Sequence, residues 1–163
     1  MDDRESDRGQ NQPSSLESWY REYWNPLVRS AWLMCGSREF AEDLVHDAFV
    51  RLYRSGVTPD SPLSYLRRTV VNLLADSTRR DRLSRAMAAE ASTIEVERAD
   101  METWQMVNGL PMRQRQALVL RYADDLSLDE IAQSMNCSQA AVKSLIHRGL
   151  EALREEMGRS AEY

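Results

Sequence analysis

Apolar residues recur every three or four positions along most of the chain, and no long stretch alternates between apolar and polar. This spacing gathers the apolar side chains on one face of an α-helix. It predicts helices at about residues 14–35, 37–55 and 61–87 in the first half of the chain. Pro26 should kink or interrupt the first helix, because proline removes a helical hydrogen bond.

A second block of helical spacing follows a break in the pattern. Residues 88–98 show no sustained apolar stripe, whereas residues 99–157 again predict short helices, one of them running from Pro111 to about Ala123. The expected fold is therefore all-α, with two small helical domains joined by a flexible linker. The expected boundaries are a disordered tail at 1–13, a first domain at 14–87, the linker at 88–98, a second domain at 99–157 and a fraying tail at 158–163.

The segment 127–148 predicts two short helices joined by a tight turn. Ser127 and Glu130 have the spacing of a capping box at the start of the first helix. Asn136 lies where the turn needs a left-handed backbone, which asparagine tolerates, and Ser138 can cap the second helix. This pattern is typical of a helix-turn-helix, although a packed helical corner would share part of it.

One face of the second helix in this segment is free to meet a major groove. Its apolar stripe includes Val142 and Leu145, and the opposite face is polar. The outward residues are Ala140, Lys143, Ser144, His147, Arg148 and Glu151.

The predicted helix from Pro62 carries a second candidate surface. Tyr65, Arg68, Asn72 and Arg79 share one face, and Arg80 extends the positive charge. Aromatic stacking, amide hydrogen bonds and arginine contacts to phosphate together can hold an unpaired nucleic-acid strand. A solvated, arginine-rich face is the alternative.

The predicted helix at 37–55 places Asp43, His46, Asp47 and Val50 outward. This face could bind a metal ion, serve acid-base chemistry or dock a protein. We expect no metal and no cofactor, because the only other histidine, His147, belongs to a distant helix. A solvated face is the default interpretation.

The net charge of −5 argues at first against a nucleic-acid-binding protein. Its distribution reverses that inference, since residues 61–85 hold six Arg against two Asp, while residues 1–60 hold seven Arg against eleven acids. Positive charge is therefore concentrated on the candidate strand-binding helix. The acidic remainder suggests that the chain binds DNA weakly alone and acts with a partner.

Other classes of protein are disfavoured. No apolar run is long enough to span a bilayer, and residues 1–15 lack the core of a signal peptide, so a cytoplasmic protein is expected. Cys35 and Cys137 have no paired spacing that would indicate zinc or a disulfide. An enzyme is the least expected reading, because no nucleophile elbow or phosphate loop is present.

Four segments in this order resemble the extracytoplasmic-function (ECF) sigma factors of bacterial RNA polymerase, over about residues 15–157. They are AEDLVHDAFVRLYR (41–54), SPLSYLRRTVVNLLADSTRR (61–80), LPMRQRQALVLRYADDLSLDEIAQSMNCS (110–138) and AAVKSLIHRGLEALR (140–154). The resemblance implies a two-domain promoter-specificity subunit that binds core RNA polymerase and promoter DNA. An anti-sigma factor is also an expected partner.

The resemblance also assigns roles to residues. It implies polymerase binding by Asp43, His46, Asp47 and Val50. It implies that the minus-ten element is opened and held by the loop 57–61 and by Tyr65, Arg68, Asn72, Arg79 and Arg80. It implies minus-thirty-five duplex contacts from Arg113, Arg115, Ser138, Gln139, Ala140, Lys143, Ser144, His147 and Arg148, with Arg121 also near the phosphates. Val71 departs from the pattern, since arginine is frequent there.

Two other functions remain open from the residues alone. A stand-alone helix-turn-helix regulator would explain residues 110–157 but would leave the Tyr65 and Asn72 face unused. A helical protein-interaction module would need no DNA at all. Binding to a duplex without polymerase would favour the regulator, and an absence of DNA binding even with core polymerase would favour the interaction module.

Overall fold

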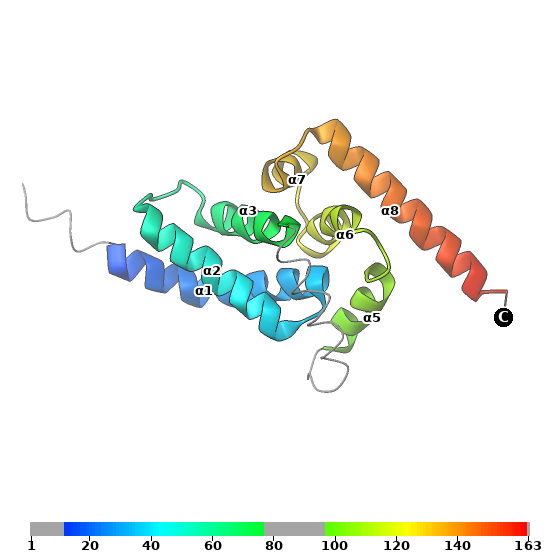
Figure 1. The fold of residues 1–163 in the computed structure, drawn as a ribbon, viewed down its shortest axis with the longest axis horizontal. Coiled ribbons are helices and arrows are strands. Elements are labelled where there is room, and N and C mark those ends of the chain that lie inside the picture. The colour runs from blue at the N-terminus through cyan, green and yellow to red at the C-terminus, as the bar shows by residue number, and fades with distance from the viewer. Residues whose placement is uncertain (1–11, 77–96, 163) are drawn as a thin grey trace, which may run out of the picture.

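The computed structural model describes residues 12–76 and 97–162, and within these ranges every regular element is helical (Figure 1). The all-α prediction is confirmed. No helix within the described ranges is long and apolar enough to cross a membrane. The helices are α1 (Gln12–Cys35), α2 (Arg38–Ser55), α3 (Pro62–Ala75), α5 (Arg98–Val107), α6 (Met112–Leu118), α7 (Leu128–Met135) and α8 (Gln139–Ser160).

Helices α1, α2 and α3 pack against one another, and local capping signals set their ends. Gly36 ends α1 with a left-handed φ of 75°, which costs glycine little. The Ser37 hydroxyl accepts the Phe40 N–H at 3.1 Å to begin α2. Ser61 caps α3 and Pro62 opens it, as predicted. The end of α1 and the starts of α2 and α3 therefore follow from local signals in the sequence.

Three expected features of the helices differ in the structure. Helix α1 continues through Pro26 without interruption, and the carbonyl of Pro26 accepts the Ser30 hydroxyl at 3.1 Å. Helix α8 continues to Ser160, so residues 158–160 are helical rather than a frayed tail. The expectation that the third helix continues to about Met87 is wrong: α3 ends at Ala75, because Asp76 takes an extended backbone (φ −66°, ψ 129°) and its N–H closes the last turn on the Leu73 carbonyl at 3.3 Å. Most of the tail at 1–13 and nearly all of the linker at 88–98 lie outside the described residues.

The second block is built around α6. A π-helical turn at Val119–Ala123 continues α6, in agreement with the predicted end at Ala123. Helix α8 lies close to α6 because Gly149 has no side chain, and a Cβ atom there would come within 2.9 Å of the Leu118 Cδ1 atom. Burial of Ile131 and Met135 fixes α7 in the same core.

The two blocks join in one continuous hydrophobic core. Trp104 of α5 is one apolar contact between them, with its ring centroid 5.9 Å from that of Trp32 on α1. A Cβ atom at Gly36 would come within 2.2 Å of the Trp104 ring, so only glycine permits this approach. Helix α3 of the first block also packs against α7 of the second (Figure 1).

Candidate nucleic-acid interface

Helices α7 and α8 form the helix-turn-helix that the sequence predicts. The Glu130 N–H donates to the Ser127 hydroxyl at 3.2 Å, and the Ser127 N–H donates to the Glu130 carboxylate at 2.7 Å. These bonds hold the pKa of Glu130 below its ordinary value of 4.5. Asn136 adopts φ 52° and ψ 50° in the turn, and the Ser138 hydroxyl accepts the Ala141 N–H at 3.1 Å. The predicted caps and turn are confirmed.

The outward face of α8 is exposed along its first turns. Val142 and Gly149 are buried on the opposite side. Exposed side chains occur at Ser138, Gln139, Ala140, Lys143, Ser144, His147 and Arg148. A major groove admits a helix of this kind, and the polar side chains of the face could reach base edges and phosphates.

Two of these side chains already have partners on the helix. His147 Nε2 lies 3.2 Å from a Glu151 carboxylate oxygen, with both side chains well exposed. The Arg148 Nε–H donates to the Ser144 carbonyl at 3.3 Å. Such exposed contacts are weak and exchange easily for contacts with a ligand.

Arg113 and Arg121 lie at the edge of the helix-turn-helix. An Arg113 N–H donates to the Met135 carbonyl at 2.9 Å, at the end of α7, and an Arg121 N–H donates to the Leu126 carbonyl at 2.7 Å. Both side chains are half-buried. Arg113 stays a candidate for phosphate contact, because it retains some exposure beside the turn.

The expectation that Arg115 lies near the phosphate backbone is wrong in this structure. The residue is only 7% exposed. Its guanidinium donates to the carbonyls of Val107, Asn108, Leu110 and Met34 at 2.7 to 3.1 Å, and it lies 5.3 Å from the Trp104 ring centroid. Three of the four carbonyls belong to its own block, so separation of the blocks would still leave Arg115 engaged.

The candidate strand-binding face on α3 is present as far as the described residues extend. Arg68 and Asn72 are exposed and Tyr65 is half-buried, while Leu66 and Val70 are buried on the inner side. Arg79 and Arg80 lie outside the described residues, as does the remainder of that basic segment.

Part of this α3 face lies opposite α7 and is not open to solvent. A crevice of about 590 Å³ separates it from α7, lined on one side by Ser64, Tyr65, Arg67 and Arg68. Asp129, Glu130 and Gln133 line the opposite side. Basic and aromatic groups of α3 therefore face acidic groups of α7.

The third predicted surface lies on α2. Asp43 and His46 are exposed, and Asp47 and Val50 are half-buried. Within the described ranges, 12–76 and 97–162, no three His, Cys, Asp or Glu side chains gather in a way that could hold a metal ion. The arrangement suits a protein partner that offers both apolar and basic groups.

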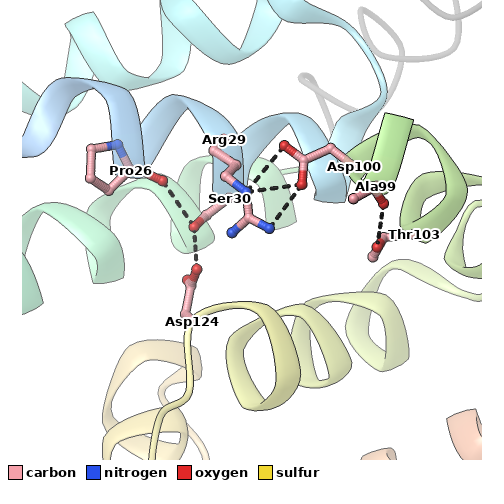
Figure 2. A network of polar contacts seen from close by, with 7 residues as sticks. All are labelled: Pro26, Arg29, Ser30, Ala99, Asp100, Thr103 and Asp124. Atoms are coloured by element: carbon pink, nitrogen blue, oxygen red, sulfur yellow. Dashed lines mark hydrogen bonds and ion pairs between the residues drawn. The ribbon is translucent and has the colours of Figure 1, made fainter. Parts of the chain in front are cut away.

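Several structurally important polar residues have no sequence signal. Asp124 accepts the Ser30 hydroxyl at 2.5 Å across 94 residues of sequence (Figure 2), and it lies 3.7 Å from Arg67 Nε. Gln116 is fully buried and donates to the Val71 carbonyl at 3.2 Å. Spacing along a single helix cannot reveal partners so far apart in the chain.

Comparisons with known proteins agree with this architecture. The family model for Sigma-70 region 2 matches residues 19–83, and that for Sigma-70 region 4 matches residues 100–153. RNA polymerase sigma-E factor of Streptomyces antibioticus is 30% identical over 126 residues, covering 72% of this chain and 70% of that protein. ECF RNA polymerase sigma factor SigW of Bacillus subtilis is 28% identical, covering 83% of this chain and 84% of that protein.

A further relative is longer than this chain. ECF RNA polymerase sigma factor SigE of Mycolicibacterium smegmatis is 27% identical over 90% of this chain, which spans only 64% of that protein. Among solved structures, the sigma factor RpoE bound to the anti-sigma factor NepR, from Bartonella quintana, has a TM-score of 0.66 and 20% identity, covering 89% of this chain and 98% of that one. Two region models matched in order within one helical chain, together with these relatives, lead to one conclusion: the chain belongs to the ECF sigma factors of bacterial RNA polymerase.

Proposed function

We propose that this chain is a promoter-specificity subunit, which directs core RNA polymerase to its promoters and opens the minus-ten element. The single observation that carries the proposal is the match to region 2 and region 4 within one chain. The chain acts as an initiation factor in the cytoplasm, where the polymerase performs the chemistry. Its two helical blocks divide the work of recognition.

The block that contains the helix-turn-helix would read the minus-thirty-five duplex. Lys143, His147 and Arg148 are exposed on one face of α8, which supports this assignment. Each good side-chain pair with a base edge contributes about 1–3 kcal/mol of discrimination. A few such contacts are enough to choose among duplex sequences once the polymerase supplies additional affinity.

The α3 face would hold the melted minus-ten strand. Opening DNA costs about 1.4 kcal/mol of stacking per base-pair step, and an acidic chain with a net charge of −5 cannot supply this by phosphate attraction alone. Stacking on Tyr65, hydrogen bonds from Asn72 and a charge from Arg68 would offset part of the cost. The loop 57–61 would border the same strand.

The α2 face would dock the chain on core polymerase. Asp43, His46, Asp47 and Val50 combine acidic and apolar groups on one helix. We also propose that an anti-sigma factor restrains the chain, as a partner of that kind is bound to the sigma factor of similar fold. A purified partner that stops promoter-directed transcription when added in equal amount would establish this.

Run-off transcription tests the proposal. Purified core polymerase should initiate from defined sites on genomic fragments only when the chain is added. With Asn72→Ala, the complex should still form but thymines in the minus-ten element should lose permanganate reactivity. Asn25→Ala is the matched control, because Asn25 is exposed on α1. Failure of the native chain to direct any start site would refute the proposal.

A further inference from the structure

The first residue of α8 has a polar partner across the turn of the helix-turn-helix. Gln139 follows directly after the cap residue Ser138, and its side chain is exposed. The Gln139 Nε2–H donates to Asp129 Oδ1 on α7 at 3.3 Å. In a helix-turn-helix, the residues at the start of the second helix are those that meet base edges. Asp129 therefore contacts a side chain that is placed to read sequence.

Both carboxylate oxygens of Asp129 are engaged. While Oδ1 accepts from Gln139, Oδ2 accepts the Gln133 Nε2–H at 3.0 Å, one turn further along α7. Asp129 lies in the first turn of α7, where the positive end of the helix dipole favours a carboxylate. The capping box of Ser127 and Glu130 fixes the backbone on either side of it. A carboxylate supported in this way is a suitable anchor for the orientation of a neighbouring side chain.

The chemistry of Asp129 determines which end of the Gln139 amide faces it. An ionised carboxylate only accepts hydrogen bonds, whereas a glutamine amide has an oxygen that accepts and a nitrogen that donates twice. Only the NH2 group of Gln139 can therefore turn toward Asp129. One N–H group and the Oε1 atom of Gln139 stay available to a ligand.

The remaining donor and acceptor of Gln139 match adenine. In the major groove, adenine offers N7 as an acceptor and its N6 amino group as a donor, while guanine offers two acceptors, N7 and O6. Gln139 in the orientation set by Asp129 can pair with both groups of adenine. Toward guanine it has one free donor, and its own oxygen would lie against O6. Full pairing with guanine would require Gln139 to give up its bond to Asp129.

We infer that Asp129 is a positioning residue for promoter specificity: by fixing the amide of Gln139, it makes the start of α8 select adenine over guanine at one position of the minus-thirty-five element. This inference rests on the proposed function and names the base that one side chain of α8 reads. Asp129 acts through Gln139 and does not itself have to touch DNA. Because the two residues belong to different helices, spacing along α8 gives no sign of this role.

The bonds that carry this role are local and weak, which suits it. Asp129, Gln133 and Gln139 are all exposed and all belong to α7 or α8, so no residue of the first block takes part in these two bonds. The bond to Gln139 only has to bias the orientation of an amide. A hydrogen bond of ordinary net strength changes such a population by about two- to tenfold.

The first test measures base preference with the complete polymerase complex. The template is a promoter that the native chain uses in run-off transcription, prepared as a pool in which each minus-thirty-five position in turn carries each of the four bases. Bound duplexes are sequenced. The native chain should prefer adenine over guanine at one position by about 5- to 100-fold. Gln139→Ala should abolish that preference and leave the other positions unchanged.

Variants of Asp129 then separate positioning from direct contact. Asp129→Ala should lower the ratio of adenine to guanine by about two- to tenfold. Asp129→Asn should also lower it, because an asparagine amide can donate to Gln139 Oε1 and so permits the reversed orientation. Asp129→Glu keeps a carboxylate and should retain more of the preference than either. Asp129→Ala combined with Gln139→Ala should give the profile of Gln139→Ala alone, because Asp129 acts through Gln139.

The ratio of adenine to guanine is the measure because overall affinity also responds to charge. Loss of a carboxylate near DNA strengthens binding to every sequence alike. Glu155→Ala removes one exposed carboxylate from α8 and is the matched control, which should leave the ratio unchanged. Circular dichroism verifies that each variant remains helical. A purely structural role of Asp129 would lower stability without changing the base preferred at a single position.

The second test observes the bond itself in the free chain. The side-chain NH2 signals of Gln139 are assigned in nitrogen–proton correlation NMR spectra by their loss in Gln139→Ala. These signals should shift in Asp129→Ala and stay in place in Glu155→Ala. The measurement needs neither polymerase nor a promoter.

The outcomes separate this inference from the proposed function. An unchanged ratio of adenine to guanine in Asp129→Ala would overturn the inference. Gln139 signals that do not respond to Asp129→Ala would also overturn it, as would a native profile with no adenine preference that depends on Gln139. Absence of transcript from the native chain would refute the proposed function instead, and the NMR signals would still report whether Asp129 orients Gln139.

Discussion

Arginine side chains with the same formal charge do different work in this protein. A guanidinium offers five N–H donors in a rigid fork and stays protonated in proteins. Arg148 is exposed on α8, whereas burial lowers the pKa of Arg115, which binds four backbone carbonyls. The surroundings of each residue, and not its type, decide whether its charge faces DNA or holds the fold together.

Replacing Arg115 should affect stability before it affects DNA binding. Arg115→Lys keeps the charge but loses the fork, so some of the four carbonyls would lose their donors. We expect the free energy of unfolding to fall by about 1–3 kcal/mol, measured by urea denaturation with tryptophan fluorescence. Arg113→Lys is the control and should change stability less, because Arg113 is half-buried. Unchanged stability with weaker promoter binding would restore the phosphate role for Arg115.

Asp124 should make stability depend on pH in the opposite sense to an ordinary ion pair. Burial raises its pKa above 3.8, against the lowering effects of the Ser30 hydroxyl, Arg67 and Arg29. The folded state therefore binds this proton more tightly than the unfolded state, and the contribution to stability is lost as pH rises through the raised pKa.

The difference in the free energy of unfolding between the native and Asp124→Asn proteins isolates the effect of Asp124. Other carboxylates, such as Glu130, whose pKa is lowered, contribute equally to both proteins. As pH falls from neutral toward 3.8, the native chain should gain stability relative to Asp124→Asn. Urea denaturation at a series of pH values measures it. A difference that stays constant, or that moves in favour of the variant, would contradict the assigned burial of the carboxylate.

Helices α3 and α8 show how one element can serve packing and recognition on opposite faces. Val142 and Gly149 bury one side of α8, which leaves its polar side to the solvent. On α3, Val71 is fully buried and its carbonyl accepts Gln116. The valine found where the family often has arginine therefore has a packing role in this chain.

The recognition face of α8 makes a prediction about salt dependence. Lys143→Ala and Arg148→Ala should each weaken binding of the polymerase complex to promoter duplex. If the side chain contacts a phosphate, the slope of log K against log salt should fall in magnitude by about 1; if it contacts a base edge, discrimination should fall instead by about 1–3 kcal/mol. Fluorescence anisotropy over a salt series distinguishes these. Arg159→Ala, exposed near the end of the helix, should change neither.

At the scale of the whole molecule, the two blocks share one hydrophobic core and are not structurally independent domains. Trp104 contacts Trp32, Gly36 and Arg115, and α3 packs on α7. Stability of the second block is therefore coupled to the first.

Unfolding of the native chain should consequently be one cooperative transition. Trp104→Ala removes an apolar contact between the blocks and should lower the midpoint, with tryptophan fluorescence and circular dichroism no longer coincident. Met106→Ala is the control on the same helix, because Met106 is 50% exposed. Two separate transitions in the native chain would show that the shared core does not couple the blocks.

Local features of this chain are determined by its sequence. Capping serines, the glycine after α1, Asn136 in the turn and the apolar stripe of α8 act within a few residues, so spacing alone predicts the helices and the helix-turn-helix. The same spacing identifies the outward residues of α2, α3 and α8. The resemblance to the ECF sigma factors rests on these local patterns, so it can be recognised from the sequence alone.

Only the tertiary structure decided which charges are exposed and how the blocks meet. Arg115 has the same charge as its half-buried neighbour Arg113, and its burial arises from carbonyls of α1 and of the segment 107–110. Asp124, Ser30 and Arg67 are brought together by packing across most of the chain length. A periodic pattern records one face of one helix, whereas these contacts depend on the geometry between helices, which no local spacing contains.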